Sequence, residues 1–355
     1  MKHLAAAVPL GLVLGPGSAA ALTDTWREQS DKVIEARGLT GVEVENRRGV
    51  VAFHRSADGK IHVTALKITR ATDREHSLAY ARETQVLTAV EDGRLAVRVR
   101  YSRRQSIHLS FWDVFSGFEL PSVEVRLSID VPDGLAVDVS TKSGDLTTED
   151  LNAPQALVTS SGDITVHSAH GPIRPVSSSG NISAVDVGRA RLQSVSGDLE
   201  VEDAHGPLTA GTTSGGISVT GAEDSLSLTT VSGDIRVTSA PRGLVARTTS
   251  GDVVAQAARG VTRLETSSGD VRIELEAPLS QADITTVSGN IGVHLASTLA
   301  CRLEMRTTNG TLDTSVPLQL KTVSRHLVTG TIRSGTAPVT LRSSSGDIEI
   351  KTGAD

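Results

Sequence analysis

The chain has 355 residues, a net charge of −6 at pH 7, and 38% hydrophobic but only 2% aromatic residues. Because Cys301 is its only cysteine, an internal disulfide is excluded. Basic residues are not clustered along the sequence, which argues against nucleic acid and against an anionic membrane surface as partners.

The first 21 residues have the pattern of an export signal. A weakly basic start precedes a mostly apolar run from Leu4 to Leu14, and three alanines end the segment at Ala21. The apolar run is too short for a transmembrane helix. We therefore predict a signal peptide over residues 1–21. The rest of the chain is then exported to the periplasm, the cell surface or the medium, and does not span a membrane.

Residues 22–134 lack a repeat and are predicted to form a β-rich capping region with one helix. Asp73 to Leu87 has the best pattern for that helix, and Asp24 to Arg37 also fits a short helix with one apolar side. Alternating apolar and polar residues predict strands at 42–44, 50–53, 61–63, 95–101 and 123–131.

An aromatic cluster lies inside this region. Phe111, Trp112, Phe115 and Phe118 fall within eight residues of a chain that has only four phenylalanines and two tryptophans. An exposed aromatic patch would suit a partner protein, a glycan or a membrane surface. The alternative, which we favour, is a plug that covers the open apolar end of the repeat region.

Residues 135–352 contain a motif, Ser-Gly-Asp followed by alternating apolar residues, that returns about every 18 residues. One repeat cannot bury its apolar side chains alone, whereas stacked repeats can. We therefore predict an all-β fold, a β-solenoid (single-stranded β-helix) of about twelve coils. The glycines that mark the repeat are Gly144, Gly162, Gly180, Gly197, Gly215, Gly233, Gly251, Gly269, Gly289, Gly310, Gly330 and Gly346.

Each repeat is expected to contain one strand that enters the glycine and one that leaves it. Apolar residues recur seven and five positions before the glycine and two and four positions after it, as in Leu226, Leu228, Ile235 and Val237. Side chains alternate between the two faces of a strand, so these positions share one face, which we assign to the core. The glycine is expected to allow a positive φ at the bend.

Two polar ladders accompany the glycines. Thr or Ser stands three positions before almost every glycine, and parity places it on the core face. We expect these hydroxyls to bond to one another and to the bend backbone. The alternative of an ice-binding face requires threonines that point outward in a regular array.

Asp or Asn follows most of the glycines. Stacked carboxylates repel each other, so we expect each to accept a hydrogen bond from nearby backbone N–H groups. Calcium is the alternative, but calcium-binding β-rolls have two Gly-Gly-x-Gly-x-Asp motifs per coil and this chain has one Gly-Asp. We predict no metal and no other cofactor.

The residues contain no recognisable catalytic constellation. His170 and His205 occupy equivalent turns two coils apart, about 10 Å, which is too far for one zinc ion. No nucleophile elbow, phosphate loop or dinucleotide fingerprint is present. A carbohydrate-active β-helix is the best enzyme alternative, but it needs paired carboxylates in a cleft. We predict that the chain is not an enzyme.

The glycine-Asp/Asn repeat, the lead-in Pro132-Asp133-Gly134 and the non-repetitive N-terminal region together resemble one bacterial family. It is the putative-adhesin family of β-strand-repeat domains of unknown function, akin to the head domain of putative auto-transporter adhesins. The resemblance covers roughly Val42 to Ile350. It implies the solenoid and an adhesive or scaffolding role, and it supplies no catalytic residues.

These observations predict an exported, non-enzymatic β-solenoid that binds a cell-envelope component, a glycan or a protein, or acts as an envelope scaffold. A second hypothesis is an accessory domain for envelope stress or signalling, in which the repeats are a spacer and the N-terminal region binds. The carbohydrate-active enzyme is the third.

Overall fold

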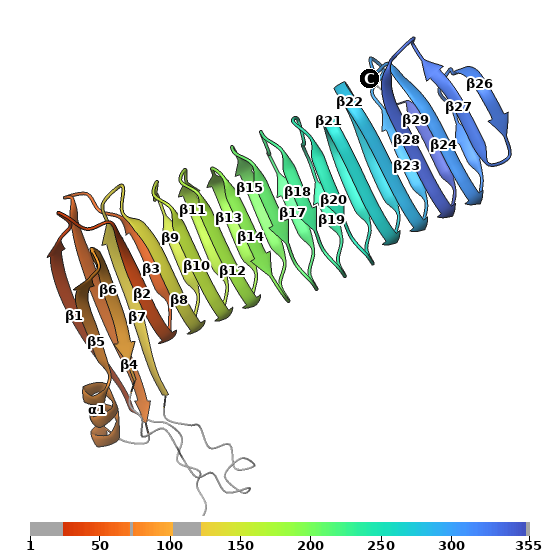
Figure 1. The fold of residues 1–355 in the computed structure, drawn as a ribbon. Coiled ribbons are helices and arrows are strands. Elements are labelled where there is room, and N and C mark those ends of the chain that lie inside the picture. Colours follow the sequence, from red (N-terminus) through yellow and green to blue (C-terminus); the bar gives the residue numbers. More distant parts are fainter. Residues whose placement is uncertain (1–23, 72–73, 102–121, 353–355) are drawn as a thin grey trace, which may run out of the picture.

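The computed structural model describes residues 24–71, 74–101 and 122–352, which form a long rod of strands (Figure 1). The described residues contain 29 strands in one continuous sheet and a single helix, α1 (Arg74–Glu83). The predicted all-β solenoid is confirmed. Residues 1–21 and the aromatic cluster at Phe111, Trp112, Phe115 and Phe118 lie outside the described residues.

Each coil pairs in parallel with its neighbours through two layers. The strands that enter the glycine bend form the leading layer, and those that leave it form the trailing layer. In stacking order, the regular leading strands are β2 (Gly41–Arg48), β8 (Ala136–Ser143), β10 (Gln155–Ser161), β12 (Ile173–Ser179), β14 (Ala190–Ser194), β16 (Leu208–Gly211), β18 (Leu226–Thr229) and β20 (Leu244–Arg247). The matching trailing strands are β3 (Val51–Arg55), β9 (Leu146–Glu149), β11 (Ile164–Ala169), β13 (Ile182–Val187), β15 (Leu199–Ala204), β17 (Ile217–Thr220) and β19 (Ile235–Val237).

Two long strands join the layers. β21 (Val253–Ser268) pairs with β19 through its first residues and with β20 through its last residues. β22 (Val271–Ser288) follows the same course one coil further along. Each therefore begins in the trailing layer and ends in the leading layer of the next coil, without a break in the strand.

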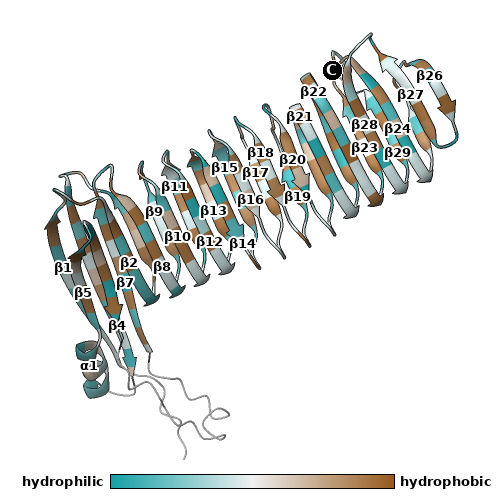
Figure 2. Ribbon diagram, viewed as in Figure 1, coloured by the Kyte–Doolittle hydropathy of each residue, from teal (hydrophilic) through white to brown (hydrophobic). Residues whose placement is uncertain are grey.

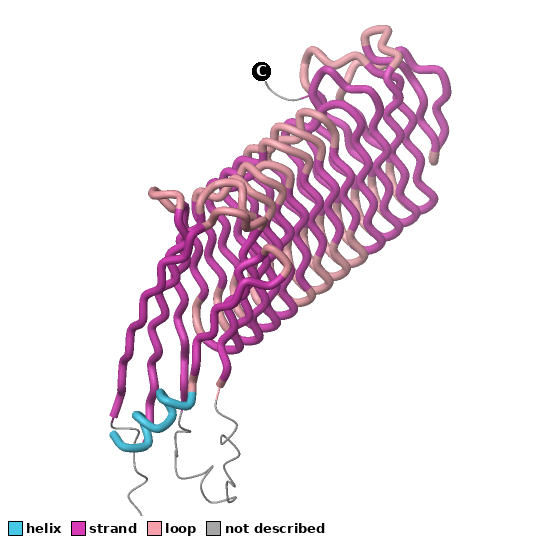
Figure 3. Tube along the Cα trace, turned by 60° about the vertical axis from the view of Figure 1, so that its left-hand side comes forward, coloured by secondary structure: helices cyan, strands magenta, loops and turns pink. Residues whose placement is uncertain are grey.

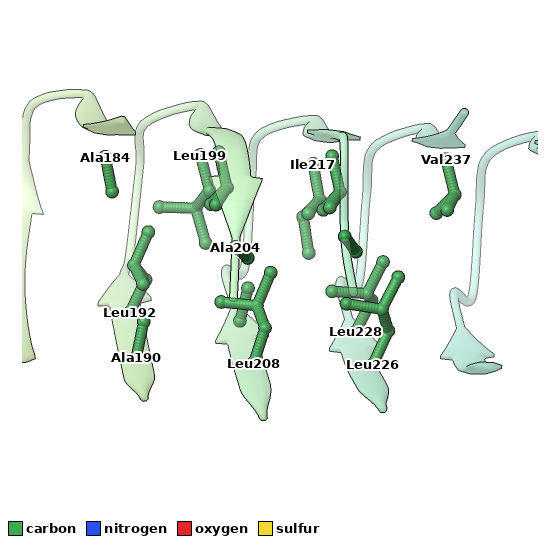
Figure 4. Close-up of a cluster of buried hydrophobic side chains, with 14 of the residues drawn as sticks. Ala184, Ala190, Leu192, Leu199, Ala204, Leu208, Ile217, Leu226, Leu228 and Val237 are labelled. Atoms are coloured by element: carbon green, nitrogen blue, oxygen red, sulfur yellow. The ribbon is translucent and has the colours of Figure 1, made fainter. Parts of the chain in front are cut away.

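The core is a thin double layer of aliphatic side chains between the two layers (Figure 4). Leu226 and Leu228 from the leading layer, and Ile235 and Val237 from the trailing layer, are buried as the period of two predicts. The same alternation appears along the strands as bands of polar and apolar residues (Figure 2). Each fully buried aliphatic side chain contributes about 1.5–3 kcal/mol, so every coil adds a similar increment to the free energy of unfolding.

The glycine bends require glycine because of close packing between coils. A Cβ atom at Gly215 would lie less than 3.0 Å from the carbonyl oxygen of Gly197, and the same holds from one bend glycine to the next. Among the predicted glycines, only Gly162 has a positive φ. We expected glycine at the bends because it allows a positive φ, and this expectation is wrong for every predicted bend glycine except Gly162. Glycine is required there because the backbones of successive coils approach each other too closely for a Cβ atom.

Positive φ angles occur at the opposite edge instead, where each coil turns back. The residue six positions after the bend glycine adopts the left-handed conformation in six coils, and in five of them it is not glycine. Figure 3 shows the loops of successive coils following one another along the rod. The residues concerned are Asp150, Ser168, Asp186, Asp203, Gly221 and Ala257.

The last coil in the sequence is not the last coil in the rod. Strand β28 (Ala337–Ser345) lies between β22 and β24 (Cys301–Asn309), and β29 (Ile348–Thr352) lies between β23 (Ile291–Leu295) and β25 (Leu312–Thr314). A hairpin of β26 (Gln319–Ser324) and β27 (Leu327–Ile332) covers the outer side of β24. The chain thus leaves the stack and returns to fill the coil that it skipped.

Gly330 is a correction to the predicted glycine ladder. It lies inside β27, opposite Leu303 in an antiparallel pair, and not at a bend. Gly49 is the twelfth bend glycine in place of Gly330. It lies at the start of the stack, where its carbonyl oxygen packs against Gly144. The bend glycines in stacking order are Gly49, Gly144, Gly162, Gly180, Gly197, Gly215, Gly233, Gly251, Gly269, Gly289, Gly346 and Gly310.

The N-terminal end adds antiparallel strands to the stack. β6 (Arg94–Arg100) and β7 (Ser122–Val131) continue the two layers beyond β2 and β3. β5 (Gln85–Glu91) pairs antiparallel with β6, and β4 (Lys60–Ala71) pairs antiparallel with β7. α1 connects β4 to β5, as the pattern of Asp73 to Leu87 predicts, although it ends earlier than expected.

The predicted helix from Asp24 to Arg37 is wrong. This segment is β1 (Asp24–Glu35), which pairs antiparallel with β4 along its entire length. The segment has too few apolar residues for its pattern to distinguish a helix from a strand. It forms a strand because it pairs with the edge of β4 that would otherwise be free. Tertiary pairing outweighs local propensity here.

Candidate functional site

The largest concave surface lies at the N-terminal end of the rod. It is an open groove of about 1260 Å³ on the outer face of the leading layer, across β5, β6, β2, β8 and β10, and the end of α1 borders it. Figure 1 shows this end, with α1 below β5. Further hollows on the described surface have volumes of about 520, 510 and 110 Å³.

Five cationic side chains from four elements line the groove. Four of them occupy outward positions of strands, and the fifth lies in the last turn of α1. They come from segments that are far apart in the sequence. They are Arg47 on β2, Arg82 on α1, Arg98 and Arg100 on β6, and Lys142 on β8. Only two carboxylates, Glu45 and Glu83, lie among them.

The repeat geometry brings two of these cations side by side. Arg47 stands two residues before Gly49, and Lys142 stands two residues before Gly144. The parallel register pairs Asn46 with Thr141 and Arg48 with Ser143, so Arg47 and Lys142 are neighbours about one strand spacing apart. Like charges opposite each other on adjacent strands are unfavourable. An anion between them would remove this repulsion.

The ionic contacts of the groove are uneven. Arg98 contacts Glu91 at 2.8 Å and Glu45 at 3.7 Å, and the hydrogen bond that its guanidinium donates to Glu91 raises the pKa of Arg98. By contrast, within the described part of the chain no carboxylate forms an ion pair with Arg47, Arg82, Arg100 or Lys142. These four exposed cations leave the groove with an excess of positive charge.

Tyr101 fixes the base of the groove. Its hydroxyl donates to the Arg48 carbonyl oxygen at 2.7 Å and accepts the Arg48 N–H at 3.2 Å. The Asn46 side chain beside it donates to the Val125 carbonyl oxygen at 2.8 Å. Burial raises the pKa of Tyr101 to about 12, so its hydroxyl stays neutral. The polar network holds the ends of β2 and β6 together beneath the cations.

The Asp/Asn ladder is occupied by hydrogen bonds between coils. Each side-chain oxygen accepts a hydrogen bond from the backbone N–H of the equivalent residue in the next coil. For example, the Asp270 N–H donates to the Asp252 carboxylate at 2.8 Å. Among the described residues, no group of three or more His, Cys, Asp or Glu side chains has a geometry that would hold a metal ion. The acceptors are Asp145, Asp163, Asn181, Asp198, Asp234, Asp252, Asp270, Asn290 and Asp347.

The Thr/Ser ladder also consists of bonds between coils. Ten hydroxyls donate to the carbonyl oxygen of the bend glycine of the preceding coil in the stack, and their side chains point inward. They are therefore not available as an outward array. These donors are Thr159, Ser177, Ser194, Thr212, Thr230, Thr248, Thr266, Thr286, Thr307 and Ser343.

His205 belongs to an ionic chain across three coils. Its Nε2 lies 3.0 Å from Asp186 and its Nδ1 lies 3.2 Å from Glu223. Hydrogen bonds from the imidazole to the carboxylates, first Glu223 and then Asp186, raise the pKa of His205. The hydrogen bond from Ser168 is the main cause that lowers the pKa of Asp186. All three side chains are well exposed on the edge of the rod, and they link coils.

The cation groove was not predicted from the sequence. The basic residues are not clustered along the sequence, but at this groove the fold brings them together from separated segments. One signal was present: if Gly49 is taken as a repeat glycine, Arg47 and Lys142 occupy the same repeat position. Arg82 and Arg100 lie outside the repeat and offer no such signal.

Comparison with protein families identifies the chain. The family model described as Toastrack DUF4097 matches residues 60–259 and 242–351. The chain belongs to the Toastrack family. The two matched ranges together span most of this Toastrack chain, from β4 to β29, and the predicted family of β-strand repeats is thereby confirmed. No curated protein matches the sequence.

Solved structures with similar architecture include three bacterial proteins. A putative cell adhesion protein from Clostridium sporogenes is 9% identical, with 92% of this chain and 100% of that chain covered and a TM-score of 0.22. A putative adhesin from Parabacteroides distasonis is 11% identical, with 91% and 97% covered and a TM-score of 0.33. A protein from the same organism described as a putative lipid binding protein is 12% identical, with 92% and 97% covered and a TM-score of 0.32. We draw no conclusion about function from scores this low.

The described part of this Toastrack chain has no helix with the length and apolar character needed to cross a membrane.

Proposed function

We propose that this Toastrack chain is an exported, non-enzymatic binding protein of the cell envelope, and that the cation groove holds an acidic glycan polymer. In this proposal the N-terminal region, residues 22–134, supplies most of the binding end. The repeats, residues 135–352, serve as a stiff spacer or scaffold that holds this end away from the point of attachment.

The excess of unpaired cations in the groove is the observation that carries this proposal. Four cations without carboxylate partners among the described residues line an open groove that crosses five strands. Carboxylates or phosphates spaced along a polymer would neutralise them in turn. The groove is open and polar, and so differs from the enclosed apolar pockets that suit small apolar ligands.

Export is supported by the sequence of residues 1–21 and by the single cysteine, Cys301. Its side chain is buried in the core, and burial raises the pKa of its thiol to about 11. The thiol is therefore protonated and shielded from oxidants, which suits an oxidising compartment.

A carbohydrate-active enzyme is less well supported. Glu45 and Glu83 are the only carboxylates that line the groove, and Glu45 lies 3.7 Å from the Arg98 guanidinium. A glycosidase needs one carboxylic acid with a raised pKa opposite a second carboxylate. We therefore assign the groove to binding without reaction.

The proposal is tested by binding of acidic polymers to the full chain. Polyphosphate and polygalacturonate serve as soluble probes, neutral dextran serves as the reference, and an array of envelope glycans extends the search. The variant Arg47→Gln/Arg100→Gln/Lys142→Gln should weaken binding about tenfold, from roughly 0.5 kcal/mol for each lost exposed ion pair. Binding of the unchanged protein should also weaken as salt is added.

A matched variant separates the groove from general charge. Arg174→Gln/Arg191→Gln/Arg306→Gln removes the same charge from exposed positions of the repeats. It should bind like the unchanged chain. If both triple variants lose binding equally, or if dextran binds as well as the acidic polymers, the groove is not the site. If none of the probes binds, the proposal fails.

A further inference from the structure

The two layers of the rod end in four strands that each have one free edge among the described residues. β5 and β26 end the leading layer, and β1 and β25 end the trailing layer. A free strand edge presents unpaired N–H and C=O groups and can pair with another chain. Natural proteins protect such edges with charges, bulges or short length.

The ends of the trailing layer are protected. β1 carries five charged residues after its first position, namely Arg27, Glu28, Asp31, Lys32 and Glu35. β25 is only three residues long. Neither strand offers a long uncharged edge, so pairing with another chain through this layer is disfavoured.

The ends of the leading layer carry fewer charges of their own than the ends of the trailing layer. The Lys32 ammonium of β1 donates a hydrogen bond to the Thr88 hydroxyl of β5 at 3.2 Å. From Gln85 to Val90, β5 has no charged residue, and Val90 is 61% exposed. Every residue of β26 is exposed, and its Leu320 and Val323 are 59% and 64% exposed. Lys321 is the only charge in β26, and it lies where the register against β27 shifts, between Leu320 and Thr322. Both segments combine β-forming residues with low charge and contain no proline, which are properties of strands that associate.

The strands β26 and β5 match in direction and in charge. β26 is parallel to the other leading strands because it is antiparallel to β27, which is antiparallel to β24. β5 is antiparallel to β6 and hence to the layer. Two rods placed end to end in the same orientation would therefore bring β26 of one copy antiparallel to β5 of the next.

The charges near the two strands have opposite signs. In an antiparallel pair that sets Val90 of β5 opposite Val323 of β26, Lys321 lies opposite Asp92, which follows Glu91 at the end of β5. Glu91 already contacts Arg98, so Asp92 is the more available anion. This complementarity favours pairing of β26 with β5 over pairing of either strand with a copy of itself.

We propose that copies of this chain associate end to end, with β26 of one copy added to β5 of the next. The contact continues the leading layer from molecule to molecule. Since it joins two different surfaces, it does not close on itself and generates a fibre. The leading layer of one copy has sixteen strands, from β5 to β26, so the axial repeat is roughly 75–80 Å at about 4.8 Å per strand. This inference is independent of the ligand in the groove.

Cysteine cross-linking of the full chain tests the contact directly. The single native cysteine, Cys301, is buried, so any cross-link must form through the cysteines introduced at the surface. Val90→Cys and Val323→Cys lie at opposite ends of the rod and cannot join within one molecule. The double variant should give a ladder of dimers, trimers and larger species on a non-reducing gel. A mixture of the two single variants should give dimers only.

The control places cysteines at Val195 and Val287, which are 54% and 52% exposed on the repeats. Val195→Cys/Val287→Cys should stay at least tenfold less cross-linked than the Val90/Val323 pair. An equal extent of cross-linking in the two double variants would overturn the proposal. Dimers in either single variant alone would also overturn it, because they would show that identical ends meet.

Sedimentation of the protein without added cysteines completes the test. The average mass should rise with protein concentration, and Val323→Lys should hold the protein at the mass of one chain. Val195→Lys is the matched change and should leave the association intact. Circular dichroism and thermal melting verify that Val323→Lys folds. A constant mass of one chain for the unchanged protein over the whole concentration range would refute the fibre.

Discussion

At the scale of single residues, the rod depends on contacts that leave no room for a side chain. Each bend glycine rests against the carbonyl oxygen of the glycine before it. The neighbouring hydroxyl and carboxylate ladders then bond from one coil to the next. A single bend therefore joins three kinds of contact within three or four residues.

Replacing a bend glycine by alanine should destabilise the rod strongly. In Gly215→Ala the new Cβ would overlap the Gly197 carbonyl oxygen, so the coils must separate locally. We expect a loss of about 2 kcal/mol or more in the free energy of unfolding. Urea denaturation measures this value.

Gly211→Ala is the control, because it lies in the same coil and its Cβ would come no nearer than 3.8 Å to other atoms. It should change stability by less than about 1 kcal/mol. Equal losses in Gly211→Ala and Gly215→Ala would show that close approach at the bend is not what selects glycine.

The ionic chain at His205 predicts a pH-dependent stability. The pKa of His205 is raised in the folded protein, so its contribution is fully present below its unfolded value of about 6.5 and is lost as the pH rises through the higher folded value. The pKa of Asp186 is lowered, so its contribution is lost only in acid. His205→Asn should therefore lower the melting temperature more at pH 5.5 than at pH 8.5.

His294→Asn provides the comparison at another exposed histidine. His294 has no ion pair to another described residue. Its effect on the melting temperature should be the same at the two pH values. A pH-independent effect of His205→Asn would mean that the ionic chain does not stabilise the fold.

At the scale of elements, the strand order at the C-terminal end goes against chain order. β28 supplies the partner for both β22 and β24. In a stack where each coil contacts only its neighbours, removal of an inner coil also releases the outer one. Truncation after Thr336 should therefore remove the hydrogen-exchange protection of β24, although β24 itself is still present.

Hydrogen exchange followed by mass spectrometry measures this effect. Peptides of β10, several coils away, provide an internal reference and should keep their protection. If β24 remains protected in the truncated chain, either its pairing with β27 is sufficient or it has moved onto the free edge of β22. That result would mean that the observed order is not required for stable stacking.

Element prediction from the sequence succeeded where one pattern repeats many times. The inward positions around the bends, such as Leu228 and Ile235, are buried as their spacing requires. The single segment from Asp24 to Glu35 gave the wrong type, since its partner β4 and not its own pattern makes it a strand. Spacing alone also placed Gly330 in the ladder, because the hairpin of β26 and β27 mimics the length of a coil.

At the scale of the whole molecule, a repeated pattern predicts the rod but does not predict its ends. The ends contain the antiparallel strands, the displaced coil and the cation groove, and each of them depends on pairing between distant segments. The groove cations come from β2, α1, β6 and β8. These cations come together because the bend at Gly49 stacks on the bend at Gly144. This contact joins segments that are far apart in the sequence, so a motif search along the chain does not reveal it.

The displaced coil also sets an order of events during synthesis. Residues 301–314 are made before residues 337–352, yet their place in the rod lies beyond them. The growing solenoid can add coils in step with the chain only as far as β23. The outermost strands must then wait, unpaired on their inner side, until the later segment inserts. Completion of the rod is thus a late, concerted closure, and a chain that stalls before residue 337 would expose an apolar, incomplete end that proteases and chaperones can recognise.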